Sequence, residues 1–236
     1  MHSRFSDRLV VALDVDSFDA AQGLVASLAG EAGWFKIGPV LFTREGPRVC
    51  EMVKRAGAKL FVDFKFHDIP NTVKGAVHNA LAMGADMLTL HASGGPTMLR
   101  AAREAADSAH RSDAILVAVT VLTHLGADEW NGTFGSSRPL EETVISLART
   151  ARSAGLNGVV ASARELVAIK RALGAECVVV TPGIRLPDAG KDDQTRVVTP
   201  EQAVHDGADY LVVGRPIIAA PDPVAACRAV VARMGS

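Results

Sequence analysis

The segment DFKFHDIPNT, residues 63–72, holds two carboxylates and an ammonium within six residues. Asp63 and Lys65 are two positions apart, so on an extended strand their side chains lie on one face. Charges within such an apolar run cost several kcal/mol unless they are paired. Two more charges, Asp14 and Lys36, stand at or near the ends of other apolar runs. A lysine between carboxylates stays protonated and can act as a proton donor, whereas a Schiff-base lysine needs the opposite environment. The alternative interpretation of these charges is a structural ion pair that closes one end of the fold and takes no part in chemistry.

A second group of residues is suited to binding a phosphate. Gly214 and Arg215 follow an apolar run, and arginine makes bidentate contacts with phosphate oxygens. Arg185 stands in the glycine-containing, charged segment 182–199, which we expect to be a lid that closes over the phosphate. The alternative is a solvated loop, with Arg215 in a surface salt bridge.

The elements that position these residues repeat along the chain. Short β-branched runs alternate with Ala- and Leu-rich segments of helical periodicity, and Gly-Ala pairs typical of helix ends precede several of the runs. Eight strand–helix units of about 30 residues each predict a (β/α)₈ barrel, an α/β fold, as one domain over residues 1–236. A doubly wound open sheet is the alternative, but no GxGxxG follows the first strand. The least regular stretches are 123–138 and 182–199, which we expect to be loops. The predicted strands cover residues 9–15, 34–38, 59–65, 87–92, 114–122, 158–162, 177–181 and 210–214. The predicted helices cover residues 17–30, 43–57, 70–84, 96–110, 139–154, 163–173, 200–207 and 222–233.

Composition limits the choice of partner and compartment. Of 236 residues, 48% are hydrophobic but only 5% aromatic, which favours buried parallel strands over an aromatic-rich sandwich. The formal net charge of −1 argues against nucleic acid and membrane surfaces as partners. The three cysteines have no CxxC spacing, and the first residues contain no signal peptide, so we expect a cytoplasmic protein.

DFKFHDIPNT closely resembles the DxKxxDIPNT signature of the orotidine 5′-phosphate decarboxylases, which catalyse the last step of de novo pyrimidine biosynthesis. Further similar segments follow in the family's order: DRLVVALD at 7–14, FKIG at 35–38, VTVLT at 119–123, TPGIR at 181–185 and VVGRPI at 212–217. The resemblance therefore spans nearly the whole chain and implies decarboxylation of orotidine 5′-phosphate to UMP in a barrel fold, without a cofactor or metal.

The resemblance also implies roles for individual residues. Lys36, Asp63, Lys65 and Asp68 would form an alternating charge array. Lys65 would protonate the carbanion formed as CO₂ leaves, and Asp63 would lie against the substrate carboxylate. Asp68 would come from the neighbouring subunit of a homodimer, together with Ile69 and Thr72. The remaining substrate contacts would be Asp14 and Lys36 to the ribose, Thr123 to the pyrimidine, and Arg185, Gln194, Gly214 and Arg215 to the phosphate.

Two other functions fit parts of the pattern. The DxKxxD core also occurs in sister sugar-phosphate lyases, such as a Mg²⁺-dependent ketogulonate-phosphate decarboxylase. There the position of Lys36 would hold an acidic magnesium ligand, so this lysine favours the nucleotide decarboxylase. A non-catalytic nucleotide-binding barrel is the second alternative, but a damaged charge array would be expected there, and all four members are present.

Overall fold

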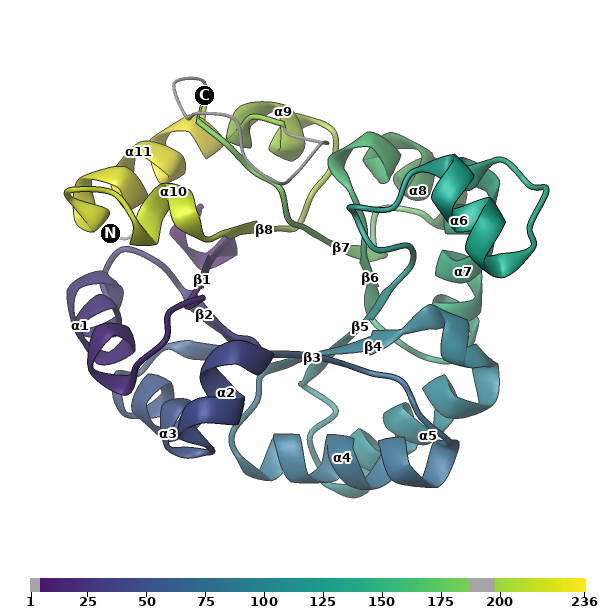
Figure 1. Cartoon of the computed structure of the whole chain (residues 1–236), viewed down its shortest axis with the longest axis horizontal. Helices are drawn as coiled ribbons and strands as arrows, with labels where there is room; N and C mark the ends of the chain where they lie inside the picture. Colours follow the sequence, from purple (N-terminus) through teal and green to yellow (C-terminus); the bar gives the residue numbers. More distant parts are fainter. Residues whose placement is uncertain (1–4, 187–197) are drawn as a thin grey trace.

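The protein is a closed barrel of eight parallel strands surrounded by helices (Figure 1), in a computed structural model that describes residues 5–186 and 198–236. Each strand pairs with its neighbours in chain order, and β8 pairs with β1 to close the barrel. The predicted (β/α)₈ fold is thus confirmed, and an open doubly wound sheet is excluded. The strands are β1 (Leu9–Ala12), β2 (Trp34–Ile37), β3 (Lys59–Phe66), β4 (Met87–His91), β5 (Ile115–Val119), β6 (Gly158–Val160), β7 (Val178–Thr181) and β8 (Tyr210–Val213).

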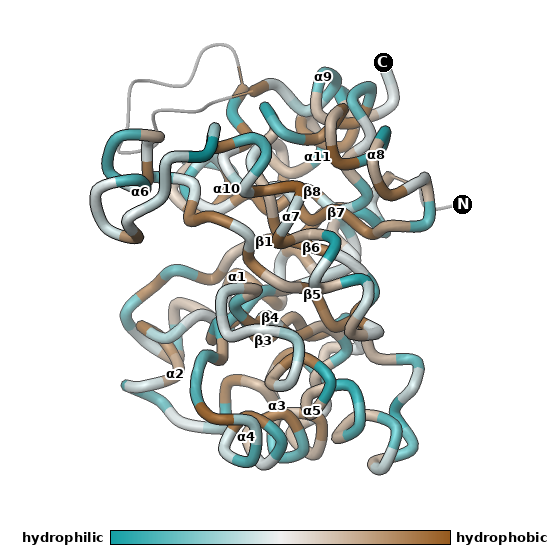
Figure 2. The backbone as a smooth tube through the Cα atoms, turned by 90° about the vertical axis from the view of Figure 1, so that its right-hand side faces the viewer, coloured by the Kyte–Doolittle hydropathy of each residue, from teal (hydrophilic) through white to brown (hydrophobic). Residues whose placement is uncertain are grey.

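The helices cover the outside of the barrel, and their apolar faces pack against the strands. Figure 2 shows apolar residues along strands such as β8 and more hydrophilic residues in the outlying connections. The α-helices are α1 (Phe18–Leu28), α2 (Pro39–Glu45), α3 (Arg48–Arg55), α4 (Pro70–Ala82), α5 (Gly95–Ser108), α6 (Ala127–Phe134), α7 (Leu140–Ser153), α8 (Leu166–Leu173), α9 (Pro200–His205), α10 (Arg215–Ile218) and α11 (Pro223–Met234). The short 3₁₀ turns are η1 (Ser6–Arg8), η2 (Ala92–Gly94) and η3 (Ala163–Glu165). No helix in the described part of the chain is both long and apolar enough to span a membrane.

Alternation along the strands separates two apolar layers. Val10, Trp34 and Phe61 belong to a cluster inside the barrel, whereas their strand neighbours Val11 and Phe35 pack outward beneath the helices. Because side chains two positions apart share a face, residues two beyond the inner ones also point inward. This two-residue alternation directs the side chains of Lys36 and Asp63 into the barrel, at the carboxyl-end side of the inner apolar cluster.

The amino ends of alternate strands are held by a repeated device. At three places an Asp or Asn side chain accepts a hydrogen bond from a backbone N–H near the start of the preceding strand. Each of these side chains stands two residues after a glycine with positive φ, namely Gly84, Gly155 or Gly207. These bonds lie at the amino ends of the strands, the face of a barrel whose residues contribute to stability. The bonds join Asp86 to Leu60 at 2.8 Å, Asn157 to Leu116 at 2.9 Å and Asp209 to Val179 at 2.7 Å.

Two predictions of local structure were wrong. Residues 123–138 are not all loop, because α6 forms within them; Trp130 and Phe134, one turn apart, stack at 4.0 Å between ring centroids, and Gly135 ends the helix in the left-handed conformation. The helix predicted over 43–57 is two helices, because a Gly-Pro pair after α2 interrupts it. α2 also begins earlier than predicted, at a proline.

Candidate active site

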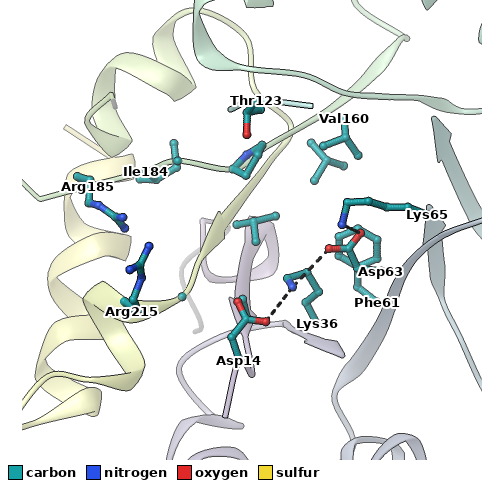
Figure 3. Close-up of a pocket in the computed structure, with 16 residues that line it drawn as sticks. Asp14, Lys36, Phe61, Asp63, Lys65, Thr123, Val160, Ile184, Arg185 and Arg215 are labelled. Carbon is teal, nitrogen blue, oxygen red and sulfur yellow. Dashed lines mark hydrogen bonds and ion pairs between the residues drawn. The ribbon is translucent and has the colours of Figure 1, made fainter. Parts of the chain in front are cut away.

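A cavity of about 460 Å³ lies at the carboxyl ends of the strands (Figure 3), where barrel enzymes carry their catalytic residues. Its charged and polar lining comes from six different strand ends, and its floor is the apolar inner layer of the barrel. The polar lining includes Asp14, Lys36, Asp63, Lys65, Thr123, Arg185 and Arg215. The apolar floor includes Ala12, Phe61, Val160, Val180 and Val212.

Four charges alternate in sign along one side of the cavity (Figure 3). The Lys36 ammonium lies 3.2 Å from Asp14 Oδ1 and 3.4 Å from Asp63 Oδ2. The Lys65 ammonium lies 2.9 Å from the other oxygen of Asp63. The predicted association of Asp14, Lys36, Asp63 and Lys65 is therefore present in the structure.

Burial and pairing together set the charge states of this row. Burial by itself would lower the pKa of Lys36, but the carboxylates of Asp63 and Asp14 raise it above its ordinary value. Burial would likewise raise the pKa of Asp63, but the ammonium groups of Lys36 and Lys65 hold it below its ordinary value. Lys36 is therefore a fixed cation and Asp63 a fixed anion at neutral pH.

Lys65 is placed by an irregularity in β3. Val62 pairs with Leu88 and Phe66 with Leu90, so β3 advances four residues while β4 advances two. Within this bulge Lys65 adopts a left-handed backbone conformation, with φ at 51°. Non-glycine residues in that region are strained by about 1–3 kcal/mol and concentrate at functional sites. From this bulge the Lys65 side chain lines the cavity, where its ammonium contacts Asp63.

Thr89 is a contact of this row that the sequence reasoning missed. This β4 residue is completely buried, and its hydroxyl bonds both the Asp63 carboxylate and the backbone N–H of Lys65. The available signal was a polar residue inside the apolar run MLTLH, two positions from the inward-facing Met87.

The predicted phosphate residues lie on the other side of the cavity. Arg185 follows β7, and Arg215 begins α10 directly after Gly214 and β8. Figure 3 shows the two guanidinium groups directed toward one another, across the cavity from Lys65. Thr123 lies between these two regions, in the connection from β5 to α6. Gln194 and most of the predicted lid lie outside the described residues.

The three residues predicted to serve a neighbouring subunit are outside the cavity of their own chain. Asp68, Ile69 and Thr72 are exposed at the start of α4, and Ile69 is 68% accessible. The carboxylate of Asp68 accepts a 2.6 Å hydrogen bond from the backbone N–H of Ile69. Within one chain, three members of the predicted catalytic array, Lys36, Asp63 and Lys65, therefore line the cavity, whereas the exposed Asp68 does not.

The site's chemistry is that of fixed charges. Across residues 5–186 and 198–236, no group of three or more His, Cys, Asp or Glu side chains is arranged to hold a metal ion. Both carboxylates of the charged row, Asp14 and Asp63, are bonded to ammonium groups instead. The geometry can hold a phosphate at one end of a ligand and place an ammonium against a developing negative charge at the other.

Comparison with known proteins agrees with this geometry. Residues 7–230 match the model of the "Orotidine 5'-phosphate decarboxylase / HUMPS family". The orotidine 5′-phosphate decarboxylase of Moorella thermoacetica is 49% identical, over 99% of this chain and 94% of its own length. That of Maridesulfovibrio salexigens is 48% identical, over 97% of this chain and 99% of its own. The crystal structure of the Lactobacillus acidophilus enzyme is similar with a TM-score of 0.86 at 33% identity, covering 97% of this chain and 99% of that one.

Proposed function

This chain belongs to the orotidine 5′-phosphate decarboxylase / HUMPS family, and we propose that it uses Lys65 as the proton donor in the decarboxylation of orotidine 5′-phosphate to UMP. The activity follows from the family and from relatives of nearly the same length. The observation that carries the mechanism is the Lys65 ammonium, 2.9 Å from the Asp63 carboxylate, on the side of the cavity opposite the two arginines.

The cavity orients the nucleotide by its two unlike ends. Arg185 and Arg215 hold the phosphate, since guanidinium groups bind phosphate oxygens bidentately. Asp14 and Lys36 hold the ribose hydroxyls midway along the cavity, and Thr123 contacts the pyrimidine. In this orientation the ring lies over the apolar floor, and its carboxylate points to Asp63 and Lys65.

Catalysis is the stabilisation of a localised carbanion. When the bond to the carboxylate breaks, its electron pair stays on the ring carbon and CO₂ leaves uncharged. The Lys65 ammonium then gives a proton to that carbon, forming the C–H bond of UMP, and the amine regains a proton from water. Before this transfer, a fixed ammonium about 4 Å away stabilises the carbanion by about 4 kcal/mol at an effective dielectric of 20. Asp63 holds the Lys65 ammonium by a 2.9 Å hydrogen bond and repels the substrate carboxylate, a repulsion relieved as CO₂ leaves.

We further propose a homodimer in which each site takes Asp68, Ile69 and Thr72 from the neighbouring subunit. The support is their outward placement beside the mouth of the barrel, with an isoleucine that is 68% exposed. Another large apolar side chain, Val40 at the start of α2, is 66% exposed. A carboxylate from the partner would complete the alternating row beyond Lys65.

Two further proposals concern the lid and the compartment. The lid predicted over 182–199 would begin at the phosphate end, because its described residues Ile184 and Arg185 line the cavity; residues 187–197 lie outside the described part of the chain. The three cysteines are buried free thiols, which fits the reducing environment of the cytoplasm.

The test of the function is the absorbance change as orotidine 5′-phosphate is converted to UMP, with and without EDTA. We expect equal turnover in both samples, because the site's carboxylates are engaged with ammonium groups. Turnover of a sugar phosphate acid that EDTA abolishes, without turnover of the nucleotide, would instead assign the protein to the Mg²⁺-dependent lyases. Binding of UMP without turnover would indicate a non-catalytic nucleotide-binding barrel.

A further inference from the structure

The hydroxyl of Thr89 forms hydrogen bonds with two groups of the site, the Asp63 carboxylate and the Lys65 backbone. Its Oγ1 donates to Asp63 Oδ1 at 3.0 Å and accepts from the backbone N–H of Lys65 at 2.9 Å. A hydroxyl carries one hydrogen, and here that hydrogen goes to the carboxylate while a lone pair receives the amide. The side chain is 0% exposed and is not among the residues that line the cavity.

The bulge in β3 creates the need for such a group. Because pairing between β3 and β4 is interrupted from Val62 to Phe66, the N–H of Lys65 is displaced from the regular ladder. The left-handed backbone of Lys65 would return to an ordinary conformation unless its surroundings held it. The hydroxyl of Thr89 on β4 accepts the hydrogen bond of this N–H in place of a backbone carbonyl and fixes the position of the amide.

The same hydroxyl also fixes the carboxylate to which the lysine is bonded. Asp63 Oδ1 receives both the Lys65 ammonium and the Thr89 hydroxyl, while Oδ2 faces Lys36. The backbone and the side chain of Lys65 are therefore tied, through Thr89 and Asp63, to one buried point on β4. Because both the backbone and the ammonium of Lys65 are held in this way, the ammonium has little freedom to change direction.

We propose that Thr89 is a positioning residue for the reaction, whose hydroxyl holds the Lys65 backbone and the Asp63 carboxylate in the geometry that proton transfer requires. The inference rests on the proposed function, and it deepens the description of that site. It predicts that the hydroxyl contributes to the chemical step and not to substrate affinity, because Thr89 does not reach the ligand.

The test compares three variants. Thr89→Val keeps the branched shape and removes the hydroxyl, and Thr89→Ser keeps the hydroxyl. The matched control is Thr120→Val, since Thr120 is 2% exposed, does not line the cavity, and its hydroxyl bonds the carbonyl of Val160 on β6 and not Asp63 or Lys65. For each variant, kcat and KM for orotidine 5′-phosphate, the Kd for UMP and the thermal unfolding midpoint are measured.

We expect kcat of Thr89→Val to fall at least about tenfold, the loss typical of a hydrogen bond to a charged group, with KM and the Kd for UMP within about threefold of wild type. Thr89→Ser restores kcat to within about threefold, and Thr120→Val retains it. A Thr89→Val enzyme with wild-type kcat, or one that loses kcat and UMP binding equally, would overturn the proposal. So would failure of Thr89→Val to fold while Thr120→Val folds, because the role would then be structural. An inactive wild-type chain would instead refute the proposed function itself.

Discussion

Replacing Lys65 by methionine tests the central charge of the site. The change removes the ammonium and keeps an unbranched side chain that can fill the same space. In the folded protein the ammonium is bonded to Asp63 at 2.9 Å, and the side chain is 34% exposed at the cavity wall. The partial exposure justifies an effective dielectric of about 20 for its interaction with a charge in the cavity.

The magnitude follows from this geometry. An ammonium about 4 Å from a carbanion contributes about 4 kcal/mol at that dielectric, which corresponds to about a thousandfold in rate. Loss of a positioned proton donor contributes a further factor of about 10² to 10⁴. We therefore expect kcat of Lys65→Met to fall by at least about 10⁵, because the charge and the proton are both absent.

The assay is decarboxylation followed by absorbance, together with the Kd for UMP measured by calorimetry. UMP binding should stay within about tenfold of wild type, since the phosphate contacts of Arg185 and Arg215 remain. The matched control is Lys59→Met, the same substitution at the other end of β3. The Lys59 side chain is 59% exposed, and its ammonium lies 3.5 Å from Asp86. Asp86 is buried, but it keeps the ammonium of Lys54 at 2.6 Å and the guanidinium of Arg111 at 3.6 Å, so kcat of this control should be unchanged.

A Lys65→Met enzyme with kcat within about tenfold of wild type would refute the reasoning, because neither the electrostatic contribution nor proton donation could then depend on this ammonium. A large loss of kcat shared by Lys59→Met would show that any charge removed from β3 disturbs the barrel, and it would refute the assignment equally.

Two further predictions concern the neighbouring subunit and acid stability. Lys65→Ala and Asp68→Ala chains, each inactive alone, should regain about a quarter of wild-type activity when mixed in equal amounts, because half the dimers are mixed and one of their two sites is intact; no recovery despite subunit exchange shown by mass spectrometry would contradict a shared site. Ionised Asp63 has a pKa below its ordinary 3.8, so it stabilises the folded state above that pH, and this stabilisation is lost as the pH falls through its folded value. Urea unfolding at a series of acidic pH values should therefore show a shallower loss of stability for Asp63→Asn than for wild type, and parallel curves would show that the group carries no such linkage.

The fold and the chemical character of the site could be predicted from local patterns. Eight apolar runs alternating with helical periodicity predict the barrel, because each unit can bury its strand and helix only against its neighbours. The spacing of Asp63 and Lys65 predicts a shared face of one strand, and the interruption of an apolar run by charge predicts a paired site. Helix α6 was missed because its aromatic stacking and terminal glycine stand in a segment that also contains loop-forming residues.

The sequence by itself therefore determined the barrel, the identity of the charged residues and the ends of the strands that carry them, because these depend on spacing along the chain. Only the tertiary structure decided which charges meet, such as Asp14 and Lys36 at 3.2 Å. It also decided that β3 bulges against β4 and that Thr89 receives the displaced amide of Lys65. The physical reason is that register and bulges result from pairing between strands distant in sequence, and a shift of one residue there moves every side chain to the opposite face.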